Sequence, residues 1–280
     1  MKLCMKQCMV QSEAMTRNVA DFDPTNRFTD RVGDYVRYRP RYPATILDTL
    51  RRDTGLTPVS VVADIGSGTG FSAEMFLENG NRVWGVEPNS AMRAAGATYL
   101  AKHPRFTAVA GTAEATTLPD ASVDYVVAGQ AFHWFERDPT RTEWARILRP
   151  TGWVALFWNS RHLDLSPFMA EYEALVHSVA PDYQRVSHEH VANHQLASMF
   201  ADGAFSYHTF PYSQLLDNAG LAGRTFSSSY APHAADARAP ALRAALADLF
   251  ARYEHEGYVQ YDYTTELYYG RIARDAHVSP

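Results

Sequence analysis

Cysteine is nearly absent from this chain of 280 residues. The only two cysteines, Cys4 and Cys8, stand close together near the N-terminus. Two thiols supply neither a disulfide framework nor a complete zinc site. Disulfides, moreover, belong to oxidising compartments. We therefore expect no structural disulfide, no metal held by these thiols, and a cytoplasmic protein.

Long apolar runs are missing as well. No stretch of 18 apolar residues occurs, although 46% of the residues are hydrophobic, so we expect neither a membrane span nor a membrane partner. Residues 1–26 have no sustained apolar segment followed by a small-residue cleavage site, which argues against a secretory signal peptide. We expect a flexible leader there. Met15 is a candidate second start site, so residues 1–14 need not belong to the mature protein.

Lysine is scarce, since only Lys2, Lys6 and Lys102 occur. The formal net charge of −5 and the isoelectric point near 6.1 do not favour a polyanionic partner, so no nucleic acid is expected. The absence of any Gly-Lys pair excludes a P-loop phosphotransferase. The Tyr-x-x-x-Lys pair of short-chain dehydrogenases is missing too, because Thr98 stands four residues before Lys102.

Histidine is the one residue type whose spacing suggests a metal. His190 and His194 would lie one helical turn apart, with His188 close by. The zinc-protease pattern H-E-x-x-H requires a glutamate at the position that Val191 occupies. A surface helix is the simpler interpretation, and we expect no metal site.

One stretch organises the rest of the chain, residues 59–70, which reads V-S-V-V-A-D-I-G-S-G-T-G. Its β-branched start, with Val59, Val61 and Val62, is typical of a strand buried on both faces. Three glycines at alternate positions follow, and the segment 71–79 has helical apolar spacing. Strand, glycine turn and helix are therefore expected. Glycine suits such a turn because it adopts positive φ and lets a ligand approach the backbone.

An acidic residue follows this strand–turn–helix segment, at the end of the next expected strand. Glu87 stands seventeen residues after Gly70, at the end of a second apolar run, residues 82–86. An acid at the tip of the second strand commonly binds a ribose diol, because a carboxylate accepts both hydroxyl protons. The dinucleotide fingerprint G-x-G-x-x-G fails here, since Phe71 occupies the position of its third glycine.

The pattern D-x-G-x-G-x-G with an acid ending strand two resembles motifs I and II of the class I S-adenosylmethionine-dependent methyltransferases. An alternating-glycine loop lets the chain pass beside the methionine part of that cofactor, with no pyrophosphate to hold. The resemblance implies S-adenosylmethionine as cofactor and S-adenosylhomocysteine as its product. The cofactor contacts that it implies in this part of the chain are Asp64, Gly66, Ser67, Gly68, Gly70, Glu87 and Pro88.

The segment 34–43 is dense in tyrosine and arginine and contains two prolines. One interpretation is a solvated basic face on a connecting segment. The other is a flap whose guanidinium pairs with the carboxylate of the cofactor. The segment is similar to the Y-x-x-Y-R-P-x-Y-P element of many small-molecule methyltransferases of type 11. This resemblance favours the flap, with Tyr38 and Arg39 as the contacts.

Later segments resemble further elements of the same family. Met92, one turn inside an expected helix, either packs against the adenine or is a plain core residue. The strings G-T-A-E at 111–114 and Q-A-F-H-W at 130–134 resemble its adenine-contacting element and its loop after strand four. The contacts that they imply are Thr112, Ala113, Glu114, Gln130, Ala131 and Phe132. His133 is our candidate general base, and a histidine that merely hydrogen-bonds in the loop is the alternative.

Strands and helices alternate regularly as far as Asn159, which predicts an α/β fold with helices on both faces of a parallel sheet. The resemblance implies a Rossmann-like sheet of seven strands, mostly parallel, with the last strand antiparallel. Residues 160–202 and 217–256 break the alternation. We expect them to be helical lid insertions on the substrate side of a methyltransferase domain of residues 27–280.

We therefore expect an enzyme, a monomer or homodimer, that transfers a methyl group to a small-molecule acceptor by direct displacement onto an O, N or C atom. Aromatic side chains expected to wall the acceptor are Phe132, Trp134, Phe226 and Tyr230. One alternative is a non-catalytic protein that binds S-adenosylmethionine, and another is an RNA or protein methyltransferase. The tip G-Q-A-F at 129–132 lacks the Asn/Asp-Pro-Pro-Tyr/Phe tetrad of amino-group nucleic-acid methylases.

Overall fold

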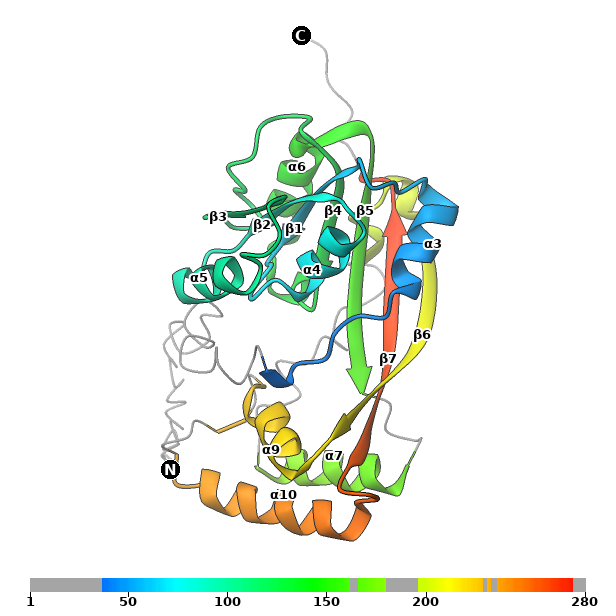
Figure 1. The fold of residues 1–280 in the computed structure, drawn as a ribbon. Helices are drawn as coiled ribbons and strands as arrows, with labels where there is room; N and C mark the ends of the chain where they lie inside the picture. The colour runs from blue at the N-terminus through cyan, green and yellow to red at the C-terminus, as the bar shows by residue number, and fades with distance from the viewer. Residues whose placement is uncertain (1–36, 162–165, 180–195, 229–230, 233–235, 274–280) are drawn as a thin grey trace, which may run out of the picture.

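The structure, a computed structural model, describes residues 37–161, 166–179, 196–228, 231–232 and 236–273. Its strands form one seven-stranded sheet in the order β3-β2-β1-β4-β5-β7-β6 (Figure 1). They are β1 (Val61–Ile65), β2 (Arg82–Val86), β3 (Phe106–Val109), β4 (Val123–Gly129), β5 (Leu148–Arg161), β6 (Ser206–Leu216) and β7 (Val259–Gly270). Strand β7 pairs antiparallel with both β5 and β6, and all other pairs are parallel, which confirms the expected Rossmann-like sheet.

Helices cover both faces of this sheet. The α-helices in the described residues are α3 (Thr45–Thr54), α4 (Phe71–Glu78), α5 (Ser90–Tyr99), α6 (Arg137–Ile147), α7 (Pro167–Val179), α9 (Asn218–Phe226) and α10 (Ala239–Tyr253). Apolar side chains of α3 and α4 pack on one face, around Val62 and Phe157. On the other face, Trp144 and Ile147 of α6 pack against Val126 and Leu156. Strands with apolar residues on both faces can lie only in such a three-layer arrangement.

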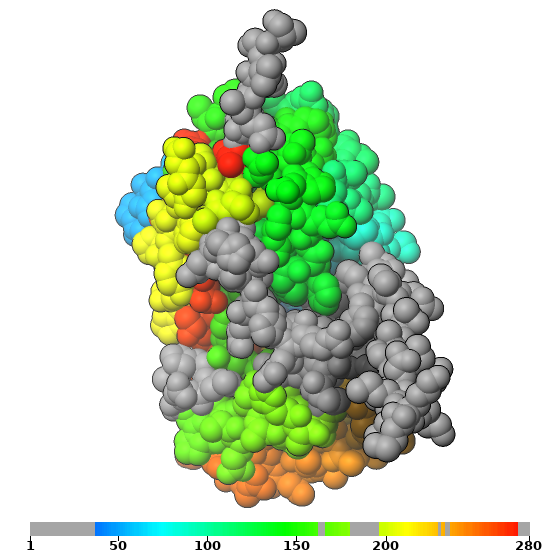
Figure 2. Space-filling model, turned by 180° about the vertical axis from the view of Figure 1, so that it is seen from behind, coloured from blue at the N-terminus to red at the C-terminus, as the bar shows by residue number. Residues whose placement is uncertain are grey.

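The last three strands reach beyond the rest of the sheet. There α7, α9 and α10 form a separate helical layer with its own apolar core, which includes Tyr261 and Tyr263 of β7 (Figure 1). Seen from behind, α7 and α10 form one end of the molecule (Figure 2). Strand β7 thus joins two cores, because Leu267 and Tyr269, further along it, belong to the core beneath α3 and α4.

A buried ion pair ties this helical layer to the sheet. Arg161, at the end of β5, donates from Nε to Glu173 Oε2 of α7 at 2.9 Å and from Nη2 to Oε1 at 3.3 Å. Both side chains are largely buried, so the pair must stay intact to avoid leaving an uncompensated charge. The pairing fixes how α7 sits against the end of the sheet.

The structure corrects several expectations of detail. Val59 is 85% exposed and precedes β1, so it is not part of the buried strand. The apolar run 153–158 predicts the fifth strand, whereas the structure extends it to Leu148–Arg161: Leu148 pairs with Val123 of β4, and after a register shift the pairing resumes between Trp153 and Tyr125. The segment 220–226 lies in α9, which Asp217 caps by accepting from the Gly220 N–H at 2.6 Å.

Two expectations concerned membranes and metals. No described helix is long and apolar enough to cross a membrane. Within the residues that the structure describes, no group of three or more His, Cys, Asp or Glu side chains is placed to hold a metal ion. The histidines at 188, 190 and 194, and most of the helix expected over 190–200, lie outside the described residues.

Candidate active site

The glycine loop leaves β1 at the carboxyl edge of the sheet, as expected. The N–H groups of Gly66 and Ser67 both donate to the carbonyl of Val86, at 2.9 and 3.1 Å, so the loop is fixed to the end of β2. Gly70 has a φ of +92°, and a Cβ there would lie 2.5 Å from the side chain of Leu100. Only glycine combines this backbone conformation with such close packing.

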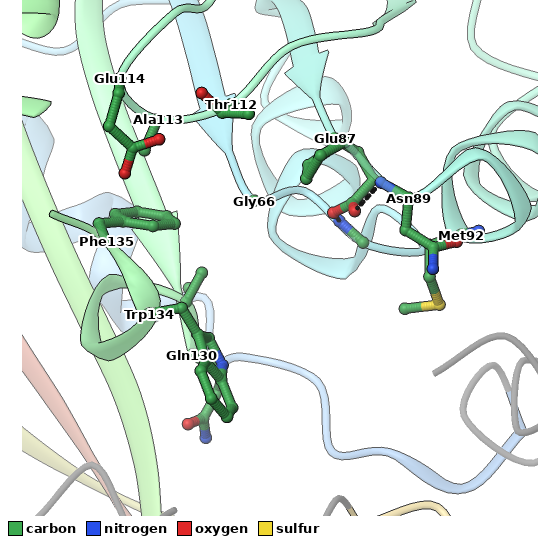
Figure 3. A pocket seen from close by; sticks show the side chains of 14 residues that line it. Gly66, Glu87, Asn89, Met92, Thr112, Ala113, Glu114, Gln130, Trp134 and Phe135 are labelled. Atoms are coloured by element: carbon green, nitrogen blue, oxygen red, sulfur yellow. Dashed lines mark hydrogen bonds between the residues drawn. The ribbon is translucent and has the colours of Figure 1, made fainter. Parts of the chain in front are cut away.

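Glu87 joins the two strand tips. Its Oε2 accepts from the Gly68 N–H at 2.9 Å, and its Oε1 accepts from the Asn89 N–H at 2.8 Å (Figure 3). Burial raises the pKa of this carboxyl, and the two N–H donors and the charge of Arg93 lower it in part. Each carboxylate oxygen keeps a second lone pair that can accept a hydroxyl. Glu87 can therefore hold the loop and bind a ligand at once.

Asp64 is buried beneath the glycine loop and does not line the cavity. It is fully buried, and its Oδ2 accepts from the Ser72 hydroxyl at 2.6 Å, in the first turn of α4. Burial raises the pKa of Asp64 to about 7, against the lowering effect of the Ser72 hydrogen bond. Its place favours a supporting role, because it fixes the start of α4 relative to the loop.

The opposite wall is the loop after β4. Gln130 has a φ of +57°, an unusual conformation for a residue with a side chain. Its N–H donates to the Phe157 carbonyl at 3.0 Å, and its Nε2 donates to the Asn159 carbonyl at 3.0 Å. A 3₁₀ turn, Phe132–Trp134, follows and brings Trp134 and Phe135 to the cavity. Backbone strain at such a position is typical of a functional site.

These two walls enclose a cavity beyond the carboxyl ends of β1, β2 and β4, where ligands bind in open α/β sheets. Figure 3 shows Glu87, Asn89 and Met92 on one side and Trp134 and Phe135 on the other. The lining residues are Gly66, Gly68, Glu87, Pro88, Asn89, Met92, Thr112, Ala113, Glu114, Gly129, Gln130, Ala131, Trp134 and Phe135. Two of them are carboxylates, and none is a lysine or arginine.

Comparison with known proteins assigns this site to a family. Residues 63–156 match the family described as "Methyltransferase domain". A protein of Schizosaccharomyces pombe, named an uncharacterized methyltransferase-like protein, is 30% identical over 193 residues, which are 68% of this chain and 72% of that protein. The chain belongs to this methyltransferase family.

Other matches agree. A Mycobacterium tuberculosis protein named an uncharacterized methyltransferase is 39% identical over 143 residues, and the match spans 50% of this chain and only 54% of that relative. A solved structure from Anaeromyxobacter dehalogenans, proposed to be a type II methyltransferase, has a TM-score of 0.64 at 25% identity and covers 85% of this chain and 100% of that one. The enzyme is a class I S-adenosylmethionine-dependent methyltransferase.

Most of the contacts expected from the sequence line the cavity of this methyltransferase. The expected residues that do so are Gly66, Gly68, Glu87, Pro88, Met92, Thr112, Ala113, Glu114, Gln130 and Ala131. Glu114 also supports the opposite wall, because its Oε1 accepts from the Glu136 N–H at 3.0 Å. Met92 faces the glycine loop, since a Cβ on Gly68 would lie 3.4 Å from its methyl group.

Four other expected contacts lie close by without lining the cavity, Asp64, Ser67, Gly70 and His133. Ser67 supports the loop from beneath, since its carbonyl accepts from the Gly70 N–H at 2.8 Å. His133 is half-buried in the 3₁₀ turn, with its ring centroid 4.8 Å from that of Trp134. This place does not bring its ring among the residues that line the cavity.

The structure corrects the expected placement of the aromatic walls. Phe132 is fully buried on the far side of its loop, where it packs against Trp144 and Trp158. Phe226 is buried in the core of the helical layer. Tyr230 lies outside the described residues. Of the three that the structure describes, only Trp134 lines the cavity; in a 3₁₀ turn, side chains two residues apart point in different directions.

The flap residues lie elsewhere as well. Tyr38 packs against α9, where a Cβ on Gly223 would lie 2.1 Å from its ring, and its carbonyl accepts from Gln214 Nε2 at 3.4 Å. Arg39 donates from Nη2 to the Ser227 carbonyl at 3.0 Å. These contacts join the segment to the helical layer and leave it outside the cavity lining.

Three lining residues were not expected from the sequence: Asn89, Gly129 and Phe135. Asn89 also caps α5, since its Oδ1 accepts from the Met92 N–H at 2.9 Å. Its position two residues after the acid at a strand tip was the available signal. Phe135 gave none, because the direction of its side chain depends on the 3₁₀ turn.

Proposed function

We propose that this cavity binds S-adenosylmethionine and that the enzyme methylates a small-molecule acceptor. The observation that carries the proposal is the charge of the lining, with two carboxylates, Glu87 and Glu114, and no cationic side chain. A dinucleotide would bring a pyrophosphate with no lysine or arginine in the lining to pair with it. A ligand with a sulfonium and an ammonium group, in contrast, suits a lining with this charge.

The shape of the cavity also fits this cofactor. Glu87 is anchored by two backbone N–H groups, so its remaining lone pairs are aimed for the two hydroxyls of a ribose. The loop comes so near the opposite wall that a Cβ on Gly66 would lie 2.7 Å from Ala131 and 3.2 Å from Phe135. A side chain at position 66 would therefore narrow the cavity where the two walls meet.

The residues around the cavity perform the reaction by positioning. S-adenosylmethionine supplies an electrophilic methyl group on its sulfonium. Direct displacement requires an in-line approach of the acceptor and a site with little water. Gln130 and Trp134 lie together at one end of the cavity, away from Glu87 and Met92 (Figure 3). We assign them to the acceptor side, where the indole walls the site and the amide orients a polar group.

His133 remains our candidate general base, within reach of that end. Its ring lies beside Trp134 but outside the lining, so a proton transfer would need a rearrangement of the 3₁₀ turn or an intervening water. A His133→Ala variant with the full wild-type rate at pH 7 would reduce the residue to a structural neighbour of Trp134. A loss of 10²-fold or more, the range typical of general bases, would support the role.

The first experiment is a calorimetric titration of the purified chain with S-adenosylhomocysteine, with NADH as the control ligand. We expect micromolar affinity for the first and no binding of the second. Binding of NADH alone would overturn the proposal. Acceptor screening with labelled S-adenosylmethionine then follows, with small molecules, total RNA and protein extract as separate arms. Transfer only to RNA or to protein would refute the small-molecule acceptor and leave the cofactor assignment intact.

A further inference from the structure

The wall that carries Gln130, Ala131, Trp134 and Phe135 is the loop between β4 and α6. Its backbone is strained at the first of these residues and is then held by a single 3₁₀ turn. Such a segment needs an outside support to keep its side chains in one arrangement. Glu114 supplies one such support at Glu136, and Arg137, the first residue of α6, supplies another at the turn itself.

We propose that Arg137 is a positioning residue that holds this wall in its binding arrangement. Its Nη1 donates to the carbonyls of Phe132 and Phe135, at 2.5 and 2.6 Å, and so bridges the two ends of the turn. Its guanidinium also lies over the ring of Phe132, with 4.1 Å from Cζ to the ring centroid. The inference rests on the proposed function, since the wall it holds is that of the proposed cofactor cavity.

The chemistry of arginine suits this task. One nitrogen binds both carbonyls while the planar cation stacks on an aromatic face, which a lysine cannot do in the same geometry. No carboxylate of the described residues pairs with Arg137, and its hydrogen bonds and its aromatic contact all go to this loop. Because these contacts require both carbonyls and the ring in their present places, Arg137 stabilises the observed conformation of the turn over other conformations.

The other wall is tied to its helix in the same way. Arg93, in the first turn of α5, donates from Nη1 to the carbonyls of Glu87 and Pro88, at 2.7 and 3.1 Å. Each wall of the cavity is thus joined to the helix that follows it by an arginine that folds back. Arg137 is the more telling case, because its wall carries both the strained residue and the indole.

The test compares Arg137→Met and Arg137→Lys with Arg149→Met. Arg149 pairs with Asp124 at 2.7 Å near the start of β5, at the end of the sheet opposite the cavity. Its variant therefore also loses an arginine contact, but one that does not hold the wall. Each variant is first checked for folding by thermal unfolding. The binding constant for S-adenosylhomocysteine is then measured by calorimetry well below the melting temperature.

A second readout reports the wall itself. Because the chain has five tryptophans, the contribution of Trp134 is obtained as the difference between each protein and its Trp134→Phe counterpart. We expect Arg137→Met to weaken binding about tenfold and to make Trp134 more accessible to acrylamide quenching, with Arg137→Lys intermediate. Arg149→Met should match the wild type in both measurements.

Wild-type affinity and unchanged Trp134 quenching in Arg137→Met, or in Arg137→Lys if the methionine variant does not fold, would overturn the inference. Failure of the proposed function looks different, because the wild type would then not bind S-adenosylhomocysteine at all. In that case the quenching of Trp134 still decides whether Arg137 holds the wall.

Discussion

Replacement of Glu87 by glutamine tests the site most directly. The carboxylate accepts one backbone N–H on each oxygen, from Gly68 and Asn89. An amide has one oxygen, so the variant keeps one of these bonds and turns its NH₂ group toward the other donor. A hydrogen bond to a charged group contributes about 1.5–3 kcal/mol. At about 1.4 kcal/mol for each tenfold change in affinity, Glu87→Gln should weaken S-adenosylhomocysteine binding about 10- to 100-fold.

The assay is calorimetry at pH 7.5 with Glu78→Gln as the matched control, since Glu78 is exposed at the end of α4 and outside the cavity. The control should bind as the wild type does. Thermal unfolding of both variants shows whether a weaker affinity comes from a local change at the glycine loop or from unfolding of the whole protein. Equal affinity of Glu87→Gln and the wild type, with both folded, would refute the assignment of this carboxylate to the cofactor.

Three further predictions concern stability. Because the folded pKa of Asp64 is raised from 3.8 to about 7, ionisation favours the unfolded chain, and stability is lost as the pH rises from about 4 to 7. Asp64→Asn, which can still accept from a hydroxyl, should lose less stability over this range. If urea unfolding at pH 5 to 8 gave the variant and the wild type the same dependence of unfolding free energy on pH, the reasoning would be contradicted. Gly70→Ala should destabilise the fold by about 1–3 kcal/mol, since a methyl group at positive φ meets Leu100, and an unchanged melting temperature would be the adverse result. Arg161→Met should cost up to about 3–5 kcal/mol because buried Glu173 would lose its two arginine hydrogen bonds and keep His177, 3.4 Å away. The double variant Arg161→Met with Glu173→Leu should recover part of this loss in chemical denaturation. If the double variant recovered no stability, the unpaired Glu173 charge would not be the cause of the loss seen in Arg161→Met.

The central site could be predicted from the sequence because its elements are local. The β-branched run, the alternating glycines and the acid at the next strand tip each follow from short-range rules, and the structure places Gly66, Gly68 and Glu87 together at the cavity. The cap of α5 follows a short-range rule as well, since an asparagine before a helix, here Asn89, accepts from a backbone N–H two or three residues on.

The flap and the aromatic wall could not be predicted in this way. Arg39 reaches a carbonyl 188 residues further along the chain, a contact that no local pattern encodes. Phe132 and Trp134 have similar chemistry, yet one is buried in the core and the other lines the cavity. Which side each ring takes depends on a 3₁₀ turn that Arg137 joins at both ends.

The sequence by itself therefore determined the family, the order of the strands along the chain and the place of the acid at the second strand tip, because each rests on residue types at short, fixed spacings. The tertiary structure alone decided which candidates surround the cavity. That choice depends on packing between distant segments: β7 lies between two earlier strands, and α7, α9 and α10 form a layer of their own against its far end. Side chains at the boundary between these layers take their direction from partners that the local sequence does not specify.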